Sequence, residues 1–265
     1  MNTFQDKVIW ITGASAGIGA AFAQECAAVG ARLVLSARRE SALNAVAMQI
    51  GIPAERCLIL PLDLAEPEMM AEKAAQVMAH FGQVDYLLHN GGISQRSLVC
   101  ETDFGVFRRL IEVNYLGTVA LTQAVLPAMI AQGSGHFAVV SSLVGKFGTP
   151  MRAGYAGSKH ALHGFFDSLR AELWADGIRV TLICPGFIRT DVSINALTAD
   201  GSPQKTMDAT TGQGLAPAVC ARRMLKAIRR KKEEVYIGKK EVAAVYLKRY
   251  FPRIFSRILR KAKVT

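Results

Sequence analysis

A tyrosine and a lysine that lie four residues apart, Tyr155 and Lys159, could together move a proton. On a helix this spacing is about one turn, so the phenol and the ammonium project from the same face. A free tyrosine has a pKa of about 10 and exchanges protons poorly at neutral pH. A nearby ammonium stabilises the phenolate, and lowering the pKa by ~3 units takes about 4 kcal/mol. Ser142, thirteen residues before Tyr155, is placed to hold a substrate oxygen by a hydrogen bond.

A glycine-rich segment follows the first apolar run and opens a predicted helix. Glycines here allow a tight turn and a close approach of the backbone to a pyrophosphate, whose charge the helix N-terminus stabilises. The spacing is GxxxGxG, which departs from the GxGxxG fingerprint. We predict that this segment binds the phosphates of a dinucleotide through Gly13, Ser15, Ala16, Gly17, Ile18 and Gly19. A tight strand-to-helix turn without a ligand is the alternative.

The end of the second predicted strand indicates which dinucleotide is bound. An NAD site usually carries Asp or Glu about 20 residues after the glycines. This sequence has Arg38 and Arg39 there and no acid. Because a guanidinium binds a 2′-phosphate that a carboxylate would repel, NADP(H) is favoured over NAD(H), with Arg38 as first candidate and Arg39 as second. Asp63, beside Leu64, is predicted at the adenine end, and a helix-capping aspartate is the alternative.

Apolar runs alternate with helical patterns along the chain. The predicted strands are 8–12, 32–37, 57–62, 84–89, 136–141, 179–184 and 235–237, and the main helices are 19–29, 41–49, 66–81, 103–129 and 155–174. Continuous apolar strands separated by helices indicate a parallel sheet covered on both faces. We therefore expect a single-domain α/β fold, a Rossmann-type doubly wound parallel sheet of about seven strands. Ligands of such sheets bind at the carboxyl ends of the strands.

In order and spacing, these motifs resemble those of the classical short-chain dehydrogenase/reductase family over about residues 5–240. The resemblance is carried by the glycine segment, Asn90-Gly91-Gly92, Asn114, Ser142, Tyr155, Lys159 and Pro185-Gly186. The sequence looks closest to the hydroxysteroid and retinol dehydrogenase-like branch, whose members often sit at membranes. The family's Asn-Ala-Gly is Asn90-Gly91-Gly92 here, a small change.

The resemblance implies a catalytic tetrad of Asn114, Ser142, Tyr155 and Lys159. Tyr155 would act as general acid in reduction and as base in oxidation, while Lys159 would lower its pKa and bind the nicotinamide ribose. Ser142 would orient the substrate oxygen, and Asn114 would hold a water in a proton relay. Further cofactor contacts would come from Asn90, Gly91, Pro185, Gly186, Ile188 and Thr190. A homodimer or homotetramer is also implied.

Composition excludes several other classes of protein. Hydrophobic residues make up 51% of the chain and charged residues 20%, which permits a sizeable core and excludes wholesale disorder. The five cysteines include no CxxC pair, so neither a disulfide framework nor a metal site is expected, and a reducing, cytoplasmic location is the expectation. No apolar run approaches the ~20 residues that span a bilayer.

Positive charge is concentrated at the end of the chain. The net charge is +11, yet residues 1–221 carry 16 basic and 18 acidic side chains, whereas residues 222–265 carry 16 basic and 3 acidic ones. We divide the chain into a catalytic domain, 1–240, with a substrate lid at about 187–215, and a basic amphipathic extension, 241–265. The extension suits peripheral contact with an anionic membrane surface. Packing on another subunit and simple solvation are alternatives, and no motif indicates nucleic-acid binding.

The predicted function is hydride transfer between NADP(H) and a carbonyl or secondary alcohol of a small-molecule substrate. Val192, Ile194 and Leu197 in the lid suggest a lipophilic substrate, although they could equally pack onto the body. One alternative is 3-oxoacyl-[acyl-carrier-protein] reduction, with the basic extension docking an acidic carrier. Another is a catalytically silent NADP(H)-binding sensor or scaffold.

Overall fold

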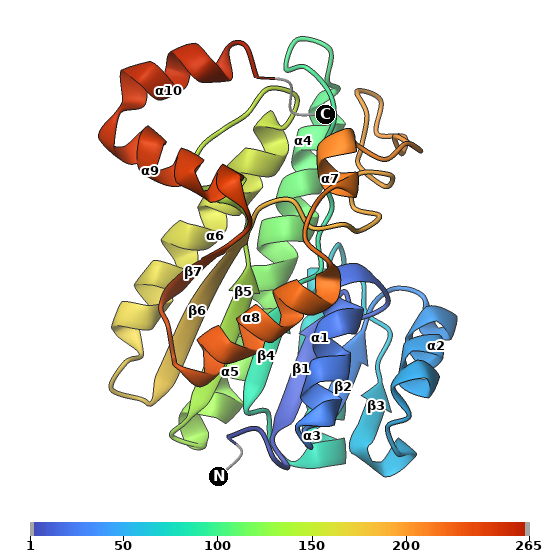
Figure 1. The fold of residues 1–265 in the computed structure, drawn as a ribbon. Helices are drawn as coiled ribbons and strands as arrows, with labels where there is room; N and C mark the ends of the chain where they lie inside the picture. The colour runs from blue at the N-terminus through green and yellow to red at the C-terminus, as the bar shows by residue number, and fades with distance from the viewer. Residues whose placement is uncertain (1–2, 263–265) are drawn as a thin grey trace.

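Seven parallel strands form one sheet in the order β3-β2-β1-β4-β5-β6-β7 (Figure 1). The computed structural model describes residues 3–262. The strands are β1 Val8–Thr12, β2 Arg32–Ser36, β3 Cys57–Ile59, β4 Tyr86–His89, β5 Gly135–Val140, β6 Ile178–Pro185 and β7 Glu234–Ile237. The order changes direction between β1 and β4, which is where doubly wound sheets bind ligands. The predicted fold class is confirmed.

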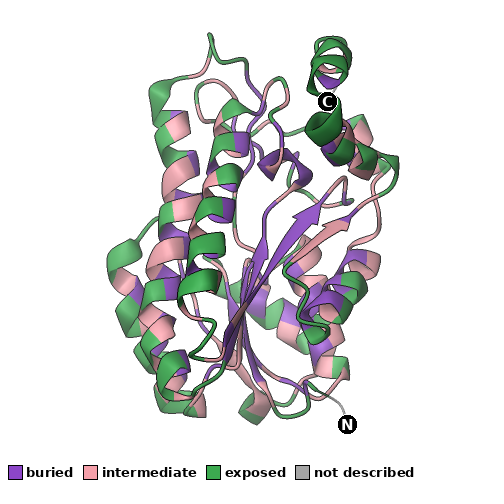
Figure 2. Cartoon of the chain, turned by 90° about the vertical axis from the view of Figure 1, so that its left-hand side faces the viewer, coloured by how far each residue is buried: buried purple, intermediate pink, exposed green. Residues whose placement is uncertain are grey.

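Helices cover both faces of the sheet because its strands are apolar on both sides. Along β1, Trp10 packs into the core on one face, whereas Ile9 and Ile11 pack into the core on the other. The first core is closed by α3 Met70–Phe81, α5 Gly117–Ala131 and α6 Ala153–Glu172. The second is closed by α1 Gly17–Ala28, α2 Glu40–Ile50 and α8 Pro217–Arg229. In Figure 2 the buried residues accordingly line the inner sides of the helices and the sheet.

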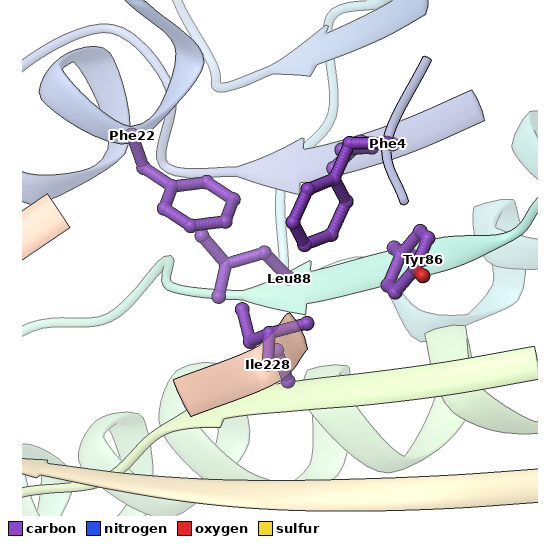
Figure 3. Close-up of a pocket in the computed structure, with 7 residues that line it drawn as sticks. Phe4, Phe22, Tyr86, Leu88 and Ile228 are labelled. Atoms are coloured by element: carbon purple, nitrogen blue, oxygen red, sulfur yellow. The ribbon is translucent and has the colours of Figure 1, made fainter. Parts of the chain in front are cut away.

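Aromatic residues fill the core beneath α1 and α8 (Figure 3). Phe4 is buried, and its ring lies 5.2 Å from that of Tyr86 at the start of β4. Phe22, Leu88 and Ile228 converge on the same small apolar hollow. Its lining belongs to the hydrophobic core, so we interpret it as packing that attaches the N-terminal segment to the sheet.

The structure corrects several predicted boundaries. β3 ends at Ile59 rather than residue 62, although the N–H groups of Leu60 and Leu62 still donate to the carbonyls of Leu35 in β2 and of Ala37 just after it. Helix α8 was not predicted at all, yet Cys220, Met224 and Ile228 occur at one-turn spacing and are buried against the sheet. Their signal is diluted by the many charges on the exposed face of the same helix.

The prediction that no apolar segment is long enough to cross a membrane is wrong, because one helix has the length and the composition of a membrane-spanning segment. The continuous helix Phe104–Ala131 passes that test. It comprises α4 Phe104–Ile111, a π-helical turn Glu112–Leu116 and α5. Leu121, Val125 and Met129 are buried in the core, so in this fold the helix is a core element whose apolar side faces the sheet.

The C-terminal extension folds back onto the catalytic unit. It contains the helices α9 Ala243–Tyr250 and α10 Pro252–Leu259, which form the outermost layer at one end of the molecule (Figure 1). Val245 and Phe255 are buried, and the ring of Phe255 lies 5.1 Å from that of Phe147. The lid, by contrast, contains one short helix, α7 Ala209–Gly212, and isolated bridges, of which the one between Gln95 and Leu197 ties it to the body.

Candidate active site

Tyr155 and Ser142 meet at the carboxyl edge of the sheet. Ser142 directly follows β5, and Tyr155 lies in the first turn of α6. Their side chains are hydrogen-bonded to each other. The Ser142 hydroxyl also donates to the carbonyl of Pro185, over 3.4 Å, and accepts from the backbone N–H of Val144, over 3.3 Å. A hydroxyl pair held in this way can present a proton to a substrate oxygen.

The Lys159 ammonium lies on the same face of α6 as the phenol. Its Nζ is 5.8 Å from the centroid of the Tyr155 ring and donates to the carbonyl oxygen of Val140, over 2.8 Å. Burial lowers the pKa of Lys159 from 10.5 to about 8, because the ammonium is desolvated inside the protein. The predicted one-turn geometry is therefore present, and the lysine is held by the backbone that ends β5.

Neighbouring groups act against the effect of burial on Tyr155. Burial raises the pKa of Tyr155, and the hydrogen bond with Ser142 together with the charges of Arg152 and Arg96 lowers it. The sequence did not indicate these two arginines. The lowering of this pKa by Lys159 stays a prediction.

Asn114 lies in the π-helical turn between α4 and α5. A π-turn is rare and often marks a functional position. The Asn114 side chain accepts from the N–H of Ile93 and donates to its carbonyl, over 2.8 and 2.9 Å, and it also donates to Ser158 Oγ, over 2.9 Å. A Cβ on Gly92 would lie 2.9 Å from Asn114 Oδ1 and 3.6 Å from Lys159 Nζ. Asn114 therefore joins the segment after β4 to the helix that carries Tyr155 and Lys159.

The glycine segment is packed against Asn90 and Gly91 at the point where the strand order changes. Asn90 Nδ2 donates to the carbonyls of Thr12 and Gly13, each over 3.1 Å. A Cβ on Gly19 would lie 2.2 Å from the Gly13 carbonyl oxygen, so only glycine fits there. Helix α1 begins at Gly17 with no capping side chain and no acid in its first turn. Its N-terminal N–H groups are therefore suited to an anionic group, and the residues fit a dinucleotide phosphate.

The other predicted cofactor residues are arranged around this segment. Leu64 lies against Gly91, and Thr190 lies against Gly17. A Cβ built on either glycine would come within 3.0 Å of that neighbouring side chain. Ile188 is buried and bridged to Leu215. Gly186 has no space for a side chain because Glu241 of the extension fills it. Glu241 also accepts from the N–H of Phe187, over 3.2 Å.

The remaining candidates lie at the rim of the site. Arg38 and Arg39 are exposed directly after β2, and within residues 3–262 neither makes an ion pair. Asp63 uses one carboxylate oxygen to accept from the N–H of Ala65, over 3.0 Å, and its side chain remains partly exposed. It is thus a turn-capping residue here, which leaves its second oxygen for a ligand.

Sequence reasoning missed a buried charge cluster that joins the lid to the catalytic helix. Arg96 donates to Asp208 in the lid, over 2.9 Å from Nε, and Arg152 Nη2 lies 3.5 Å from the same carboxylate. All three side chains are less than a tenth exposed. Gln95 Oε1 accepts from the N–H groups of Gly154 and Tyr155, over 2.8 and 3.3 Å, and so caps α6. A signal was available, because Gln95-Arg96 follows the Asn90-Gly91-Gly92 turn and Arg152 precedes Tyr155 by three residues.

Fold and site together define a nucleotide-binding oxidoreductase of the Rossmann type. Residues 7–200 match the family model for short chain dehydrogenases. The chain is 42% identical to dehydrogenase/reductase SDR family protein 7-like of Drosophila melanogaster, over 99% of this chain and 82% of the relative, and 42% identical to dehydrogenase/reductase SDR family member 7B of Bos taurus, over 96% and 81%. It therefore belongs to the short-chain dehydrogenase/reductase family.

Solved structures share the fold. A short-chain dehydrogenase/reductase of Burkholderia phymatum, in complex with NAD, superposes with a TM-score of 0.84 at 23% identity, covering 96% of each chain. A short-chain dehydrogenase of Burkholderia cenocepacia, in complex with NADP, gives 0.81 at 24% identity, covering 96% of this chain and 98% of the other. The fold thus accommodates either nucleotide in these proteins.

Replacing Lys159 by methionine should stabilise the protein, since a buried ammonium is costly to keep charged. With a pKa of about 8 in the folded state against 10.5 when exposed, we expect a gain of about 2 kcal/mol in unfolding free energy at pH 7, after allowing for the lost hydrogen bond. The gain should be complete below pH 8 and shrink as the pH rises towards 10.5, because there the wild-type lysine is neutral when folded. Urea unfolding of Lys159→Met, with the exposed Lys248→Met as control, tests this. Equal destabilisation at every pH would contradict it.

Replacing Arg152 by glutamine should raise the pKa of Tyr155, because the positive charge that stabilises the phenolate is removed. The measurement is the alkaline absorbance titration of tyrosinate, with the matching Tyr155→Phe protein subtracted. Arg109→Gln, an exposed arginine on α4, is the control and should leave the titration unchanged. An unchanged titration in Arg152→Gln would show that this arginine does not act on the phenol.

Proposed function

We propose that this chain transfers hydride between NADP(H) and a carbonyl or secondary alcohol of a lipophilic small molecule, with Tyr155 as the general acid and base. One observation carries the proposal. The Tyr155 hydroxyl is hydrogen-bonded to Ser142 at the carboxyl edge of the sheet, beside the glycine segment and the Lys159 ammonium. The bound nicotinamide supplies or accepts the hydride.

The protein's own residues position the substrate oxygen and its proton. Ser142 orients that oxygen, and Tyr155 donates a proton to it in reduction or removes one in oxidation. Lys159 would bind the ribose hydroxyls of the nicotinamide, and Asn114 would hold a water in a proton relay. The charges of Arg152 and Arg96 lower the pKa of Tyr155 and so act against burial, which raises it.

The preference for NADP(H) rests on the charges at the end of β2. Arg38 and Arg39 are exposed there, and the stretch Ser36-Ala37-Arg38-Arg39 contains no carboxylate that would repel a 2′-phosphate. An NADP complex of a protein with the same fold is consistent with this preference, and the NAD complex of another shows that the fold alone does not determine it.

The lipophilic substrate is inferred from the surroundings of Tyr155. Its ring packs against two apolar clusters, one with Leu143, Val144 and Phe147, the other with Val106, Leu110 and Leu197. The second cluster thus includes Leu197 of the lid, whereas Val192 is exposed. The alternative, a 3-oxoacyl-[acyl-carrier-protein] reductase, is less well supported, because the 42% identical relatives are SDR family proteins 7-like and 7B. We also propose a homodimer or homotetramer, as the family resemblance implies.

Tyr155→Phe should abolish turnover and leave NADPH affinity within about twofold of wild type, since the hydroxyl transfers the proton and the phosphates are bound elsewhere. An NADPH-consumption screen across ketosteroids, retinals, aromatic aldehydes and ketoacyl thioesters provides the substrate. NADPH fluorescence titration measures binding. A purified variant that turns over at a rate near wild type would refute the role of Tyr155.

Arg38→Asp should reduce the preference for NADPH over NADH by about 10- to 100-fold, the range expected for one charge-assisted hydrogen bond of ~1.5–3 kcal/mol. The ratio of kcat/KM for the two nucleotides is the measurement. Arg229→Asp, which makes the same charge change on the exposed side of α8, is the control. If both variants change the ratio equally, Arg38 does not recognise the 2′-phosphate.

A further inference from the structure

Large exposed apolar side chains gather at the end of the molecule where the strands have their carboxyl ends. They come from the segment before α4 and the first residue of that helix, from the lid and from α9–α10, which Figure 1 places at that end. These residues are Leu98, Val99, Phe104, Val192, Met207, Tyr246, Tyr250, Phe251, Ile254 and Ile258. Such a concentration on one end of a folded chain indicates an interaction surface.

Helix α10, together with Phe251 before it and Arg260 and Lys261 after it, carries three distinct stripes. Phe255 and Leu259, one turn apart, face the catalytic unit. Phe251, Ile254 and Ile258 form a second stripe at helical spacing, and each is between 50% and 57% exposed. The third stripe is cationic and follows on the far side of the apolar one, with Arg253, Arg257, Arg260 and Lys261. An apolar stripe bordered by cations is the pattern of a helix that lies in a membrane interface.

The cations of this surface are not neutralised by the protein. Within residues 3–262 no ion pair involves Lys248, Arg249, Arg253, Arg257, Arg260 or Lys261. Residues 222–265 hold 16 basic and 3 acidic side chains, whereas the rest of the chain is nearly neutral. The partner of this surface must therefore bring negative charge of its own.

We propose that α9–α10 docks the protein onto the surface of an anionic bilayer. The stripe Phe251, Ile254 and Ile258 enters the headgroup region, and the neighbouring arginines contact lipid phosphates. A second copy of the chain is a poorer partner for this face, because a symmetric contact would bring two sets of unpaired cations together. The inference concerns binding and does not depend on the proposed reaction.

The docked face adjoins the catalytic residues. Phe255 packs on Phe147, and the cluster that includes both also contacts Tyr155. The apolar cluster on the inner side of the extension therefore reaches the catalytic residue, and the proposed docking would place Tyr155 close to the lipid surface.

Co-sedimentation of the full chain with vesicles tests the proposal. The vesicles are phosphatidylcholine alone or an equal mixture of phosphatidylcholine and phosphatidylglycerol. We expect the wild type to pellet with the anionic vesicles only and to be released by high salt. Each surface cation contributes about fivefold to partitioning, so Arg253→Gln/Arg257→Gln/Arg260→Gln should lower the partition coefficient by more than tenfold.

Ile254→Ser/Ile258→Ser should also lower binding by more than tenfold, whereas Met48→Ser/Ile130→Ser, at exposed positions elsewhere, should not. Thermal unfolding shows whether each variant is folded. Wild-type protein that stays in the supernatant with both vesicle types overturns the proposal. So does equal loss of binding in both serine variants. A wild-type dimer that Ile254→Ser/Ile258→Ser converts to a monomer, without vesicle binding by either protein, would instead show a subunit interface.

Discussion

The parallel arrangement of the strands is the constraint on which the site depends. Because all seven strands run in the same direction, every strand ends at the same edge of the sheet, and the segments after β1, β4, β5 and β6 meet there. These segments lie so close together that a Cβ on Gly19 would clash with the Gly13 carbonyl, and Asn90 donates to the carbonyls of Thr12 and Gly13 at the start of the glycine turn. Helix crossovers on both faces then bury the strands and leave this edge available for ligands.

Buried charge is the second organising feature. Lys159, Arg96, Arg152 and Asp208 are all nearly inaccessible to solvent, although ionised groups are costly to bury. Asp208 accepts from Arg96 and lies within ion-pairing distance of Arg152, and Lys159 is held by a backbone carbonyl. These contacts offset part of the cost and hold the lid, the segment after β4 and the start of α6 in one arrangement. The charges that influence Tyr155 thus also position it.

The C-terminal helices have an inner side that packs on the catalytic unit and an outer side that is exposed. Their inner residues, Val245 and Phe255, extend the apolar cluster that reaches Tyr155, and Glu241 fills the space beside Gly186. Their outer residues combine apolar side chains with unpaired cations. The extension is consequently part of the catalytic unit by its packing, even though its composition differs sharply from the rest of the chain.

The sequence by itself determined the sheet, the glycine turn and the one-turn spacing of Tyr155 and Lys159, because these are local patterns of apolar periodicity, glycine placement and helical geometry. It also revealed the charge of the last helices. Only the tertiary structure decided that Arg96 and Arg152 share Asp208 beside the phenol, that Gln95 caps α6, and that Phe255 packs on Phe147. Those contacts join residues up to 112 positions apart, and local patterns carry no information on such distances. Burial, which sets the pKa of Tyr155 and Lys159, likewise exists only once the chain has folded.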